Sequence, residues 1–318
     1  MKTAQAIGSS ASSASAVGSP PVRLEGRRCL VTGATSGIGL AVAEAMASLG
    51  YELLLVGRSA ERLRGAANRV ALRAAAAGAP SPIAEIADLS SMRDVAALAQ
   101  RVAARWSRLD VLVNCAGVYM ARRVLTAEGL ETQFAVNHLA PFLLTTSLLP
   151  LLGTAASARI ITVSSDSHYY GWIRWRDPSM RGRYLGLWAY EQSKLANVLF
   201  SAELARRLGP GCSISTYAAD PGLVNTAMGE KHGLTPSSLF WRLRRRAGTS
   251  PDIPAGDIAW LASSNEVSRN SGLYWKRRAS VPPSRLARKA GAGPRLWALS
   301  EKAIRDVLLR PAGGQGRR

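Results

Sequence analysis

The sequence contains few of the side chains that bind metal ions or form disulfides. Only three cysteines and three histidines occur among 318 residues. Cys29, Cys115 and Cys212 are expected inside strands and lack the close pairing of a zinc knuckle, and the histidines form no ligand pattern either. We therefore expect buried, reduced thiols and no bound metal. Nothing in the cysteine usage demands an oxidising compartment.

Long hydrophobic runs are missing as well. Apolar residues make up 47% of the chain, yet no uninterrupted run reaches the roughly 18 residues of a membrane-spanning helix. Residues 1–21 also lack the apolar segment of a secretory signal. We therefore expect a cytoplasmic protein whose Ala/Ser/Gly-rich first 21 residues are disordered. A transit peptide stays open, because serine is frequent and no acid precedes Glu25, although an Arg-rich amphipathic pattern is missing.

Acidic residues are half as numerous as basic ones. The formal charge is +20 and the isoelectric point is near 11.0, values typical of nucleic-acid-binding proteins. The basic residues are scattered, however, and no basic stretch interleaves with aromatics. We expect no nucleic-acid partner. The densest excess follows Lys231, and the basic region 230–250 is expected either to touch a membrane surface or to form a solvated face.

Repeats are absent, and short apolar runs instead alternate with longer segments of helical length. The runs are Cys29–Thr32, Glu52–Val56, Pro82–Ile86, Val111–Asn114, Arg159–Ser164, Ser213–Ala218 and Gly272–Trp275. This alternation predicts an α/β fold, namely a Rossmann-type doubly wound parallel seven-stranded sheet with helices on both faces. We expect a single domain over residues 22–310, flanked by the tail 1–21 and a basic tail at 311–318.

The sequence also indicates where several helices begin and end. Gly50 and Gly78 are expected to end two helices in left-handed conformations, and Ser90 to cap a third that reaches Trp106. Two stretches, about 166–187 and 227–254, interrupt the alternation after the fifth and sixth strands. Such excursions lie at the carboxyl edge of a parallel sheet, where ligands bind, so we expect them to form the substrate loops.

The first strand-to-helix turn reads VTGATSGIG, with glycines at Gly33, Gly37 and Gly39. Glycines let the backbone approach a pyrophosphate, and the following helix offers unpaired N–H groups at its positive end. The pattern predicts a dinucleotide site.

Three motifs in order carry a family resemblance. They are TGATSGIG, NCAG at Asn114–Gly117 and YEQSK at Tyr190–Lys194. With them, the chain from Gly26 to Trp275 resembles the short-chain dehydrogenase/reductase family. VSSDSHY at Val163–Tyr169 and DPGLVNT at Asp220–Thr226 are similar to its retinol-dehydrogenase-like branch.

The resemblance implies catalytic roles for Ser165, Tyr190, Lys194 and Asn137. Tyr190 and Lys194 are four residues apart and share one helix face. A neighbouring ammonium and a cationic nicotinamide are expected to lower the pKa of the tyrosine, so that it exchanges a proton as general acid or base.

The two other assignments leave alternatives open. Ser165 is expected to bond the reacting oxygen, with Ser164 as the alternative. Asn137 either joins a water relay to the lysine and supports the central helix, or makes only a local backbone bond.

Cofactor contacts are implied over most of the same motifs. They are Gly33, Thr35, Ser36, Gly37, Ile38, Gly39, Arg58, Asp88, Leu89, Asn114, Ala116, Gly117, Tyr190, Lys194, Pro221, Gly222, Val224 and Thr226. After the second strand Arg58 stands where a carboxylate would select NAD, so we expect NADP(H), with NAD(H) still open. Asp88 either accepts from the adenine amino group or caps a helix. Cys115 replaces the commoner second Asn of the family motif, which removes one polar contact.

Bulky aromatic side chains are concentrated in the two excursions. They are Tyr169, Tyr170, Trp172, Trp175, Tyr184, Trp188, Phe240 and Trp241. Such residues favour a bulky apolar alcohol, aldehyde or ketone as substrate, and the amphipathic segment from Ser237 is a candidate lid. Substrate identity and reaction direction stay open, as does the choice between monomer and homodimer. Two alternatives remain: a catalytically silent NADP(H)-binding redox sensor, and a polyanion- or membrane-binding module on the same fold.

Overall fold

The computed structural model describes residues 26–224, 248–268 and 270–311. One sheet of eight strands has the order β3-β2-β1-β4-β5-β6-β7-β8. The strands are β1 (Arg28–Thr32), β2 (Glu52–Gly57), β3 (Ile83–Ile86), β4 (Val111–Asn114), β5 (Ala158–Val163), β6 (Ile214–Asp220), β7 (Tyr274–Lys276) and β8 (Ala279–Ser280). The first seven are parallel, which confirms the doubly wound fold. The strand order reverses between β1 and β4, and ligands bind at such a switch point.

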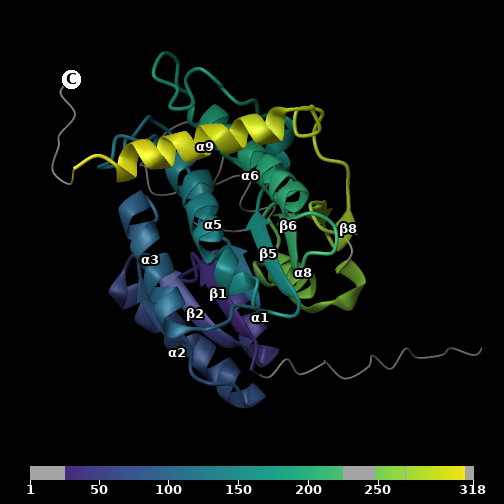
Figure 1. Cartoon of the computed structure of the whole chain (residues 1–318). Helices are drawn as coiled ribbons and strands as arrows, with labels where there is room; N and C mark the ends of the chain where they lie inside the picture. Colours follow the sequence, from purple (N-terminus) through teal and green to yellow (C-terminus); the bar gives the residue numbers. More distant parts are fainter. Residues whose placement is uncertain (1–25, 225–247, 269, 312–318) are drawn as a thin grey trace, which may run out of the picture.

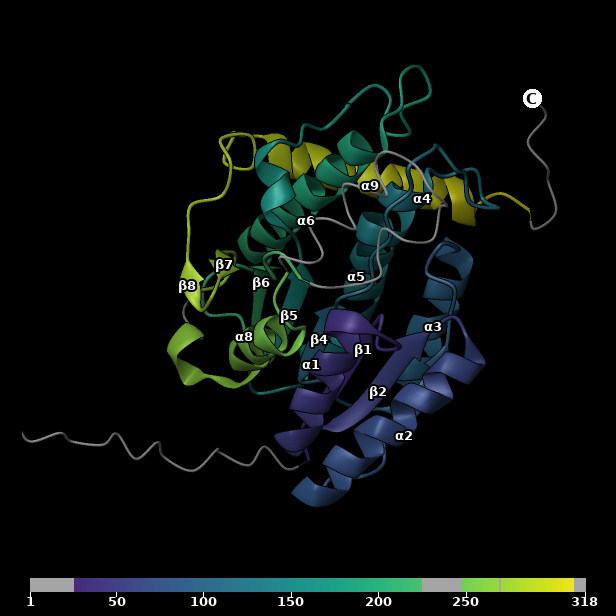
Figure 2. The same cartoon turned by 180° about the vertical axis from the view of Figure 1, so that it is seen from behind.

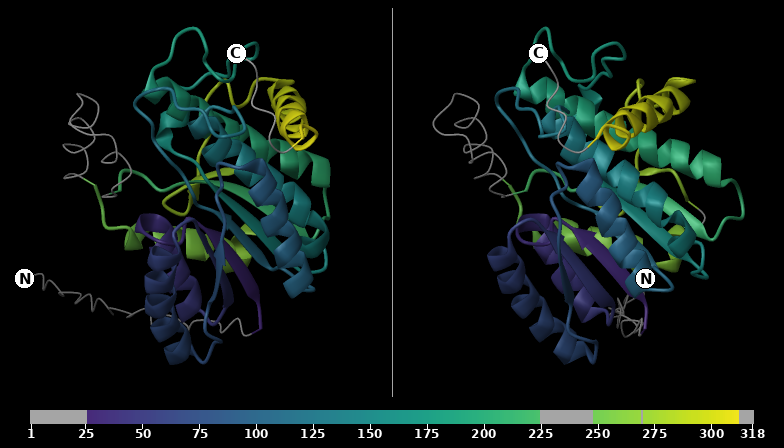
Figure 3. Two further views of the ribbon diagram at one scale, coloured as in Figure 1. Left: turned by 90° about the vertical axis from the view of Figure 1, so that its left-hand side faces the viewer. Right: turned by 60° about the vertical axis from the view of Figure 1, so that its left-hand side comes forward.

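Helices cover both faces of the sheet (Figures 1 and 2). They are α1 (Gly37–Ser48), α2 (Ala60–Ala77), α3 (Met92–Arg105), α4 (Thr132–Phe134), α5 (Ala140–Leu152), α6 (Gly186–Leu208), α8 (Asp252–Ser263) and α9 (Ala292–Leu308). Helices α1, α2 and α8 pack on one face, and α3, α5 and α6 pack on the other. Helix α9 lies across the outside of α5 and α6 (Figure 3).

Alternation along the buried strands builds the two cores. In β2, Leu54 and Val56 face α3 and α5, whereas Leu53 and Leu55 face α1 and α2. Successive side chains of a strand point to opposite faces, and both faces of this sheet are covered. The central strands are therefore apolar at nearly every position.

Local signals placed most helix boundaries correctly. Gly78 ends α2 with φ +73°, as expected, and Gly50 follows α1 with φ +87°. The expected cap of α3 was wrong by one residue, because Ser91 rather than Ser90 accepts the capping bond from the Asp94 N–H. Ser90 instead donates its hydroxyl to the carboxylate of Asp88.

The eighth strand was not expected from the sequence. The two-residue strand β8 pairs antiparallel with β7 across Arg277 and Arg278, whose φ angles are +50° and +59°. Two positive φ angles are the geometry of a type I′ hairpin turn. Neither a two-residue strand nor an Arg-Arg turn carries a sequence signal for this hairpin.

Two further expectations are modified. Cys29 is buried, but Cys115 is only partly buried and Cys212, in the loop before β6, is exposed.

The stretch Thr132–Leu152 is long and apolar enough to cross a membrane by length and composition, with a mean hydropathy of 1.4, although 72% of its apolar window is buried inside the protein. It includes a π-helical turn at Ala135–Leu139.

Several expectations lie outside the described residues. They are the tail 1–21, Thr226, the larger part of the second excursion with Phe240 and Trp241, and nearly all of the tail 311–318.

Candidate active site

The glycine-rich turn between β1 and α1 brings three backbone segments into close contact. A Cβ added to Gly33 would lie 2.8 Å from the Ala116 Cα, and one added to Gly57 would lie 2.5 Å from the Thr35 Cγ2. Ser36 precedes α1 and its side chain makes no capping bond. Gly37, Ile38 and Gly39 then form the first turn of α1, and the first N–H groups of a helix have no partner within it.

Thr32 joins this turn to the loop after β4. Its hydroxyl oxygen accepts bonds from the N–H groups of Cys115 at 3.0 Å and Ala116 at 3.2 Å. The sequence analysis did not single out Thr32, although it stands inside the glycine-rich motif. Its role depends on a loop more than 80 residues away, which the local pattern does not reveal.

Asn114 is the last residue of β4, and only one of its two side-chain amide atoms has a hydrogen-bond partner among the described residues. Its Nδ2 donates to the Thr145 hydroxyl at 3.0 Å, whereas its buried Oδ1 has no hydrogen-bond partner among the described residues. A buried acceptor without a partner is costly, and a hydroxyl of a bound ligand would satisfy it. Together with the glycine cradle, this acceptor fits a ribose-containing dinucleotide, with Ala116 and Gly117 following on the same loop.

The end of β2 presents a cation. Arg58 directly follows the strand and is exposed. On the neighbouring strand end, Asp88 is also exposed, and its Oδ1 accepts from the backbone N–H and the hydroxyl of Ser90. Asp88 does not cap α3, whose cap is Ser91, so the capping alternative is wrong. Leu89 next to it is partly buried. Leu89 packs against the core.

A turn closes the site after β6. Pro221 is followed by Gly222 at φ +71°, and Val224 forms a parallel bridge with Thr249. Asp220 holds this turn: its Oδ1 accepts from the Gly222 N–H at 2.8 Å. The sequence analysis noted Asp220 only as part of a motif.

The carboxylate of Asp220 also meets two groups on β7. Its side chain is completely buried, and its Oδ2 accepts from the Tyr274 hydroxyl at 2.8 Å and pairs with the Lys276 Nζ at 3.2 Å. Asp220 therefore links the closing turn to the sheet.

Three expected catalytic side chains meet between β5 and α6. Tyr190 is 6% exposed and Lys194 is 3% exposed, and the lysine Nζ lies 5.4 Å from the centroid of the tyrosine ring. The Ser165 side chain hydrogen-bonds the Tyr190 side chain. The Lys194 Nζ itself donates to the Val163 carbonyl at 3.0 Å.

Burial shifts the pKa values of both Tyr190 and Lys194. It raises the pKa of Tyr190 above its usual range, and the hydrogen bond from Ser165 only partly offsets this. From the sequence we expected a lowered pKa, with the ammonium and a bound cationic nicotinamide acting together. In the chain alone burial decides the direction, because it disfavours the phenolate, and the carboxylates of Asp166 and Asp220 act the same way. Burial also lowers the pKa of Lys194 to about 8, although Cys115 and Asp220 oppose that shift.

The two serines that follow β5 have different partners. The Ser164 hydroxyl is buried and donates to the Lys194 carbonyl at 2.8 Å. The Ser165 hydroxyl faces Tyr190 and also approaches the Asp166 carboxylate at 3.1 Å. The geometry favours Ser165 over Ser164 as the group that meets a substrate oxygen.

Asn137 makes long-range rather than local bonds. It lies in the π-helical turn, and such turns are frequent at functional sites. Its Oδ1 accepts from the Val118 N–H at 2.8 Å, and its Nδ2 lies 3.0 Å from both the Val118 carbonyl and the Ser193 hydroxyl. Asn137 thus ties the loop after β4 to α6, next to Lys194.

The site geometry and the sequence pattern together decide the family. The pattern of the short chain dehydrogenases matches residues 27–236. The chain belongs to the short-chain dehydrogenase family. It is 37% identical to human retinol dehydrogenase 14 over 303 residues, which span 90% of this chain and 89% of that protein. The predicted resemblance to the retinol-dehydrogenase-like branch is confirmed.

Two further members of the family differ in what they are named for. A protein of Streptomyces sp. (strain C5), named as a candidate daunorubicin C-13 ketoreductase, is 37% identical, with 91% of this chain and 96% of that protein covered. A short-chain dehydrogenase of Escherichia coli CFT073, solved in complex with NADPH, is 26% identical. Its TM-score is 0.63, and the match covers 82% of this chain and 100% of that one. As a short-chain dehydrogenase, this chain is an oxidoreductase.

The aromatic residues of the first excursion are only partly available to a substrate. Trp175 packs against the core, and the Tyr184 hydroxyl donates to the buried Glu131 carboxylate at 3.0 Å. Trp172 and Trp188 contact each other at 5.3 Å between ring centroids, while Tyr170 is 74% exposed. Trp175 and Tyr184 thus anchor the excursion to the fold, whereas Tyr170 is open to solvent.

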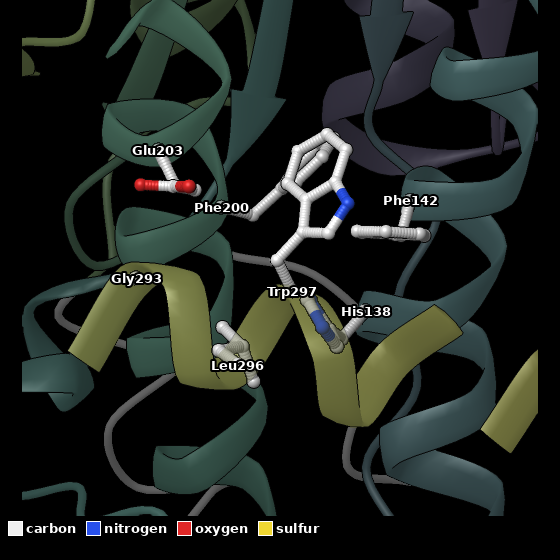
Figure 4. A pocket seen from close by; sticks show the side chains of 7 residues that line it. All are labelled: His138, Phe142, Phe200, Glu203, Gly293, Leu296 and Trp297. Atoms are coloured by element: carbon white, nitrogen blue, oxygen red, sulfur yellow. The ribbon is translucent and has the colours of Figure 1, made fainter. Parts of the chain in front are cut away.

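A small hollow lies elsewhere in this short-chain dehydrogenase. It lies between α5, α6 and α9, with Trp297 set between Phe142 and Phe200 (Figure 4), and it does not admit even a water molecule. Phe200 is ten residues beyond Tyr190 on α6, roughly 15 Å along the helix axis. The hollow is separate from the catalytic residues and belongs to the packing of α9.

Proposed function

We propose that the chain is an NADP(H)-dependent oxidoreductase that interconverts a bulky apolar alcohol with its aldehyde or ketone. The observation that carries this proposal is the buried pair Tyr190 and Lys194, with the half-buried Ser165, beside the glycine cradle of β1 and α1. Arg58 at the end of β2 supports a preference for the 2′-phosphate of NADP(H), because no carboxylate stands there. The NADPH complex of the Escherichia coli relative supports the same cofactor.

In reduction the protein supplies the proton. The bound cofactor would supply a hydride to the carbonyl carbon. Tyr190 donates its phenolic proton to the substrate oxygen, and Ser165 donates a hydrogen bond to that oxygen. Lys194 offsets the negative charge left on the phenol. Because burial raises the pKa of Tyr190, the phenol holds its proton at neutral pH.

The substrate class rests on the excursion and on the relatives. Trp172 and the exposed Tyr170 belong to the segment that follows β5 at the carboxyl edge of the sheet, and Trp172 contacts Trp188 in the first turn of α6. One relative is named a retinol dehydrogenase and another a candidate daunorubicin C-13 ketoreductase, and both names refer to bulky substrates. We therefore propose a bulky apolar carbonyl compound or alcohol as substrate.

The test is NADPH oxidation with a panel of polyene aldehydes, steroid ketones and anthracycline ketones, repeated with NADH. With an active substrate, Tyr190→Phe removes the dissociable proton and keeps the ring. Turnover should fall about a hundredfold or more, while NADPH affinity stays nearly unchanged. Tyr51→Phe is the matched control, because Tyr51 is equally buried but bonds the Ala262 carbonyl far from the site. An active Tyr190→Phe enzyme would rule out this mechanism.

A further inference from the structure

A buried histidine, His168, contacts the backbone of Ser165, the candidate catalytic serine. The His168 side chain is completely buried. Its Nδ1 lies 2.8 Å from the Ser165 carbonyl oxygen, and its Nε2 lies 3.1 Å from the backbone nitrogen of Ser284. The ring therefore bridges the end of β5 and the segment between β8 and α9.

These two partners fix where the proton of the ring resides. A backbone N–H only donates, so the Nε2 facing Ser284 must carry the lone pair. A carbonyl oxygen only accepts, so the Nδ1 facing Ser165 must carry the proton. Burial lowers the pKa of His168, which keeps this ring neutral at neutral pH. His168 thus holds a single tautomer.

The ring is also held in orientation. It lies between Tyr169 and Tyr274, at 4.1 Å and 4.5 Å between ring centroids. Each tyrosine hydroxyl is anchored in turn, one on the Pro282 carbonyl and the other on the Asp220 carboxylate. Charged groups facing the histidine are Asp166 on its own segment, Asp220 at the end of β6 and Lys276 on β7. His168 therefore has little freedom to rotate.

The carbonyl that His168 holds belongs to the residue whose hydroxyl faces Tyr190. Ser165 is extended, with φ −172°, and begins the 3-10 turn Asp166–Tyr169. Its carbonyl receives both the Nδ1–H and the backbone N–H of His168. Fixing this carbonyl fixes the peptide plane that follows Ser165, and it thereby restricts ψ of Ser165 and the direction of its Cα–Cβ bond. Catalytic groups lose activity when their supporting residues allow displacements near 1 Å.

We propose that His168 is a positioning residue that aims the Ser165 hydroxyl at the reacting oxygen through its Nδ1–H bond. The inference rests on the proposed function, in which Ser165 acts on that oxygen. It assigns separate tasks to the two nitrogens: Nδ1 serves catalysis, whereas Nε2 serves the docking of the Ser284 segment.

Two substitutions separate these tasks. In His168→Asn the amide N–H takes the place of Nδ1 and still reaches the Ser165 carbonyl, but nothing reaches Ser284. In His168→Gln the amide oxygen takes the place of Nε2 and accepts from Ser284, but no donor stands at the Nδ1 position. We expect kcat to fall roughly tenfold or more in His168→Gln, with KM for NADPH nearly unchanged. His168→Asn should keep kcat within about threefold of wild type while its Tm falls.

A structural role alone would give a different pattern. If kcat follows Tm in both variants, or if His168→Asn loses as much turnover as His168→Gln, the positioning role is overturned while the proposed function stands.

The ring tautomer provides a readout that needs no substrate. Nitrogen-15 NMR of the wild type, with only three histidines to assign, should show His168 protonated at Nδ1, and protonation at Nε2 would overturn the inference. If the wild type oxidises no NADPH, the proposed function fails, and the tautomer still decides whether His168 holds Ser165.

Discussion

Gly39 lies so close to Gly33 that a Cβ added to Gly39 would come within 2.3 Å of the Gly33 carbonyl oxygen. Relieving such a clash would require the backbone itself to move, because the contacting atom does not belong to a flexible side chain. The first turn of α1 and the strand-to-helix turn before it are therefore in direct backbone contact, and this contact shapes the cradle proposed for the pyrophosphate.

We expect Gly39→Ala to weaken NADPH binding at least tenfold and to lower Tm, because the added methyl group pushes the turn away from α1. Gly65→Ala is the matched control. Gly65 also lies within a helix, but a Cβ there meets nothing within 4 Å, so alanine should stabilise the protein by about 0.5 to 1 kcal/mol. Fluorescence titration with NADPH and thermal unfolding measure both effects. Unchanged NADPH affinity in Gly39→Ala would contradict the cradle assignment.

Arg58 should decide the choice of cofactor. We expect wild-type protein to bind NADPH at least tenfold more tightly than NADH, since one charge-assisted contact of about 1.4 kcal/mol gives that ratio. Arg58→Asp should reverse the order. Arg73→Asp makes the same charge change near the far end of α2 and should leave the ratio unchanged. Equal affinities for the two cofactors in the wild type would show that Arg58 only faces solvent.

Lys194 should set the alkaline limit of activity. A lysine is charged below its pKa, so with the pKa lowered to about 8 the ammonium is present at pH 7 and lost as the pH rises through 8. We expect kcat/KM for the carbonyl substrate to decline above about pH 8, because kcat/KM reports the free enzyme. Stopped-flow or steady-state assays from pH 6 to pH 10 measure this profile. A flat profile up to pH 10 would mean that the charge of Lys194 is not needed.

His138 should make the fold sensitive to acid. Burial lowers its pKa to about 4, with a bond to Asn197 opposing the shift. The unfolded chain takes up a proton below about pH 6.5 while the folded chain resists it, so stability declines as the pH falls from 6.5 to 4. The shift corresponds to about 3 kcal/mol.

The matched variant for this effect is His138→Gln. Glutamine keeps a hydrogen-bonding group toward Ser300 in place of Nε2, gives up the longer contact of Nδ1 with Asn197 and takes up no proton. Urea unfolding at pH 7 and pH 5 should therefore show a smaller loss in the variant than in the wild type. Equal losses in the two proteins would assign the acid sensitivity to other groups, among them His168, whose pKa is lowered as well.

Short-range patterns account for what sequence analysis achieved. Strand alternation and glycine caps depend on neighbours within a few residues, so the parallel sheet and the ends of α2 could be predicted. The spacing of Tyr190 and Lys194 needs only a helix to place both on one face. Ser91 in place of Ser90 shows the usual uncertainty of one residue at helix ends.

Contacts between distant segments account for the features that could not be predicted from the sequence. Thr32 serves a loop more than 80 residues away, and Asp220 meets its partner Tyr274 54 residues later. The direction of the Tyr190 pKa shift was also missed. That shift depends on how much protein surrounds the phenol, and no local pattern reports burial of a polar group.

The sequence by itself determined the doubly wound fold and the family, and it predicted the cofactor turn and the reacting side chains, because periodicity and motif spacing are local properties. Only the tertiary structure decided which serine faces Tyr190, where Asn137 finds its partners and how His168 is protonated. Each of these depends on groups that folding brings together: His168 and Ser284 are 116 residues apart. The free energy of burying a polar group is set by those partners, and they exist only once the chain has folded.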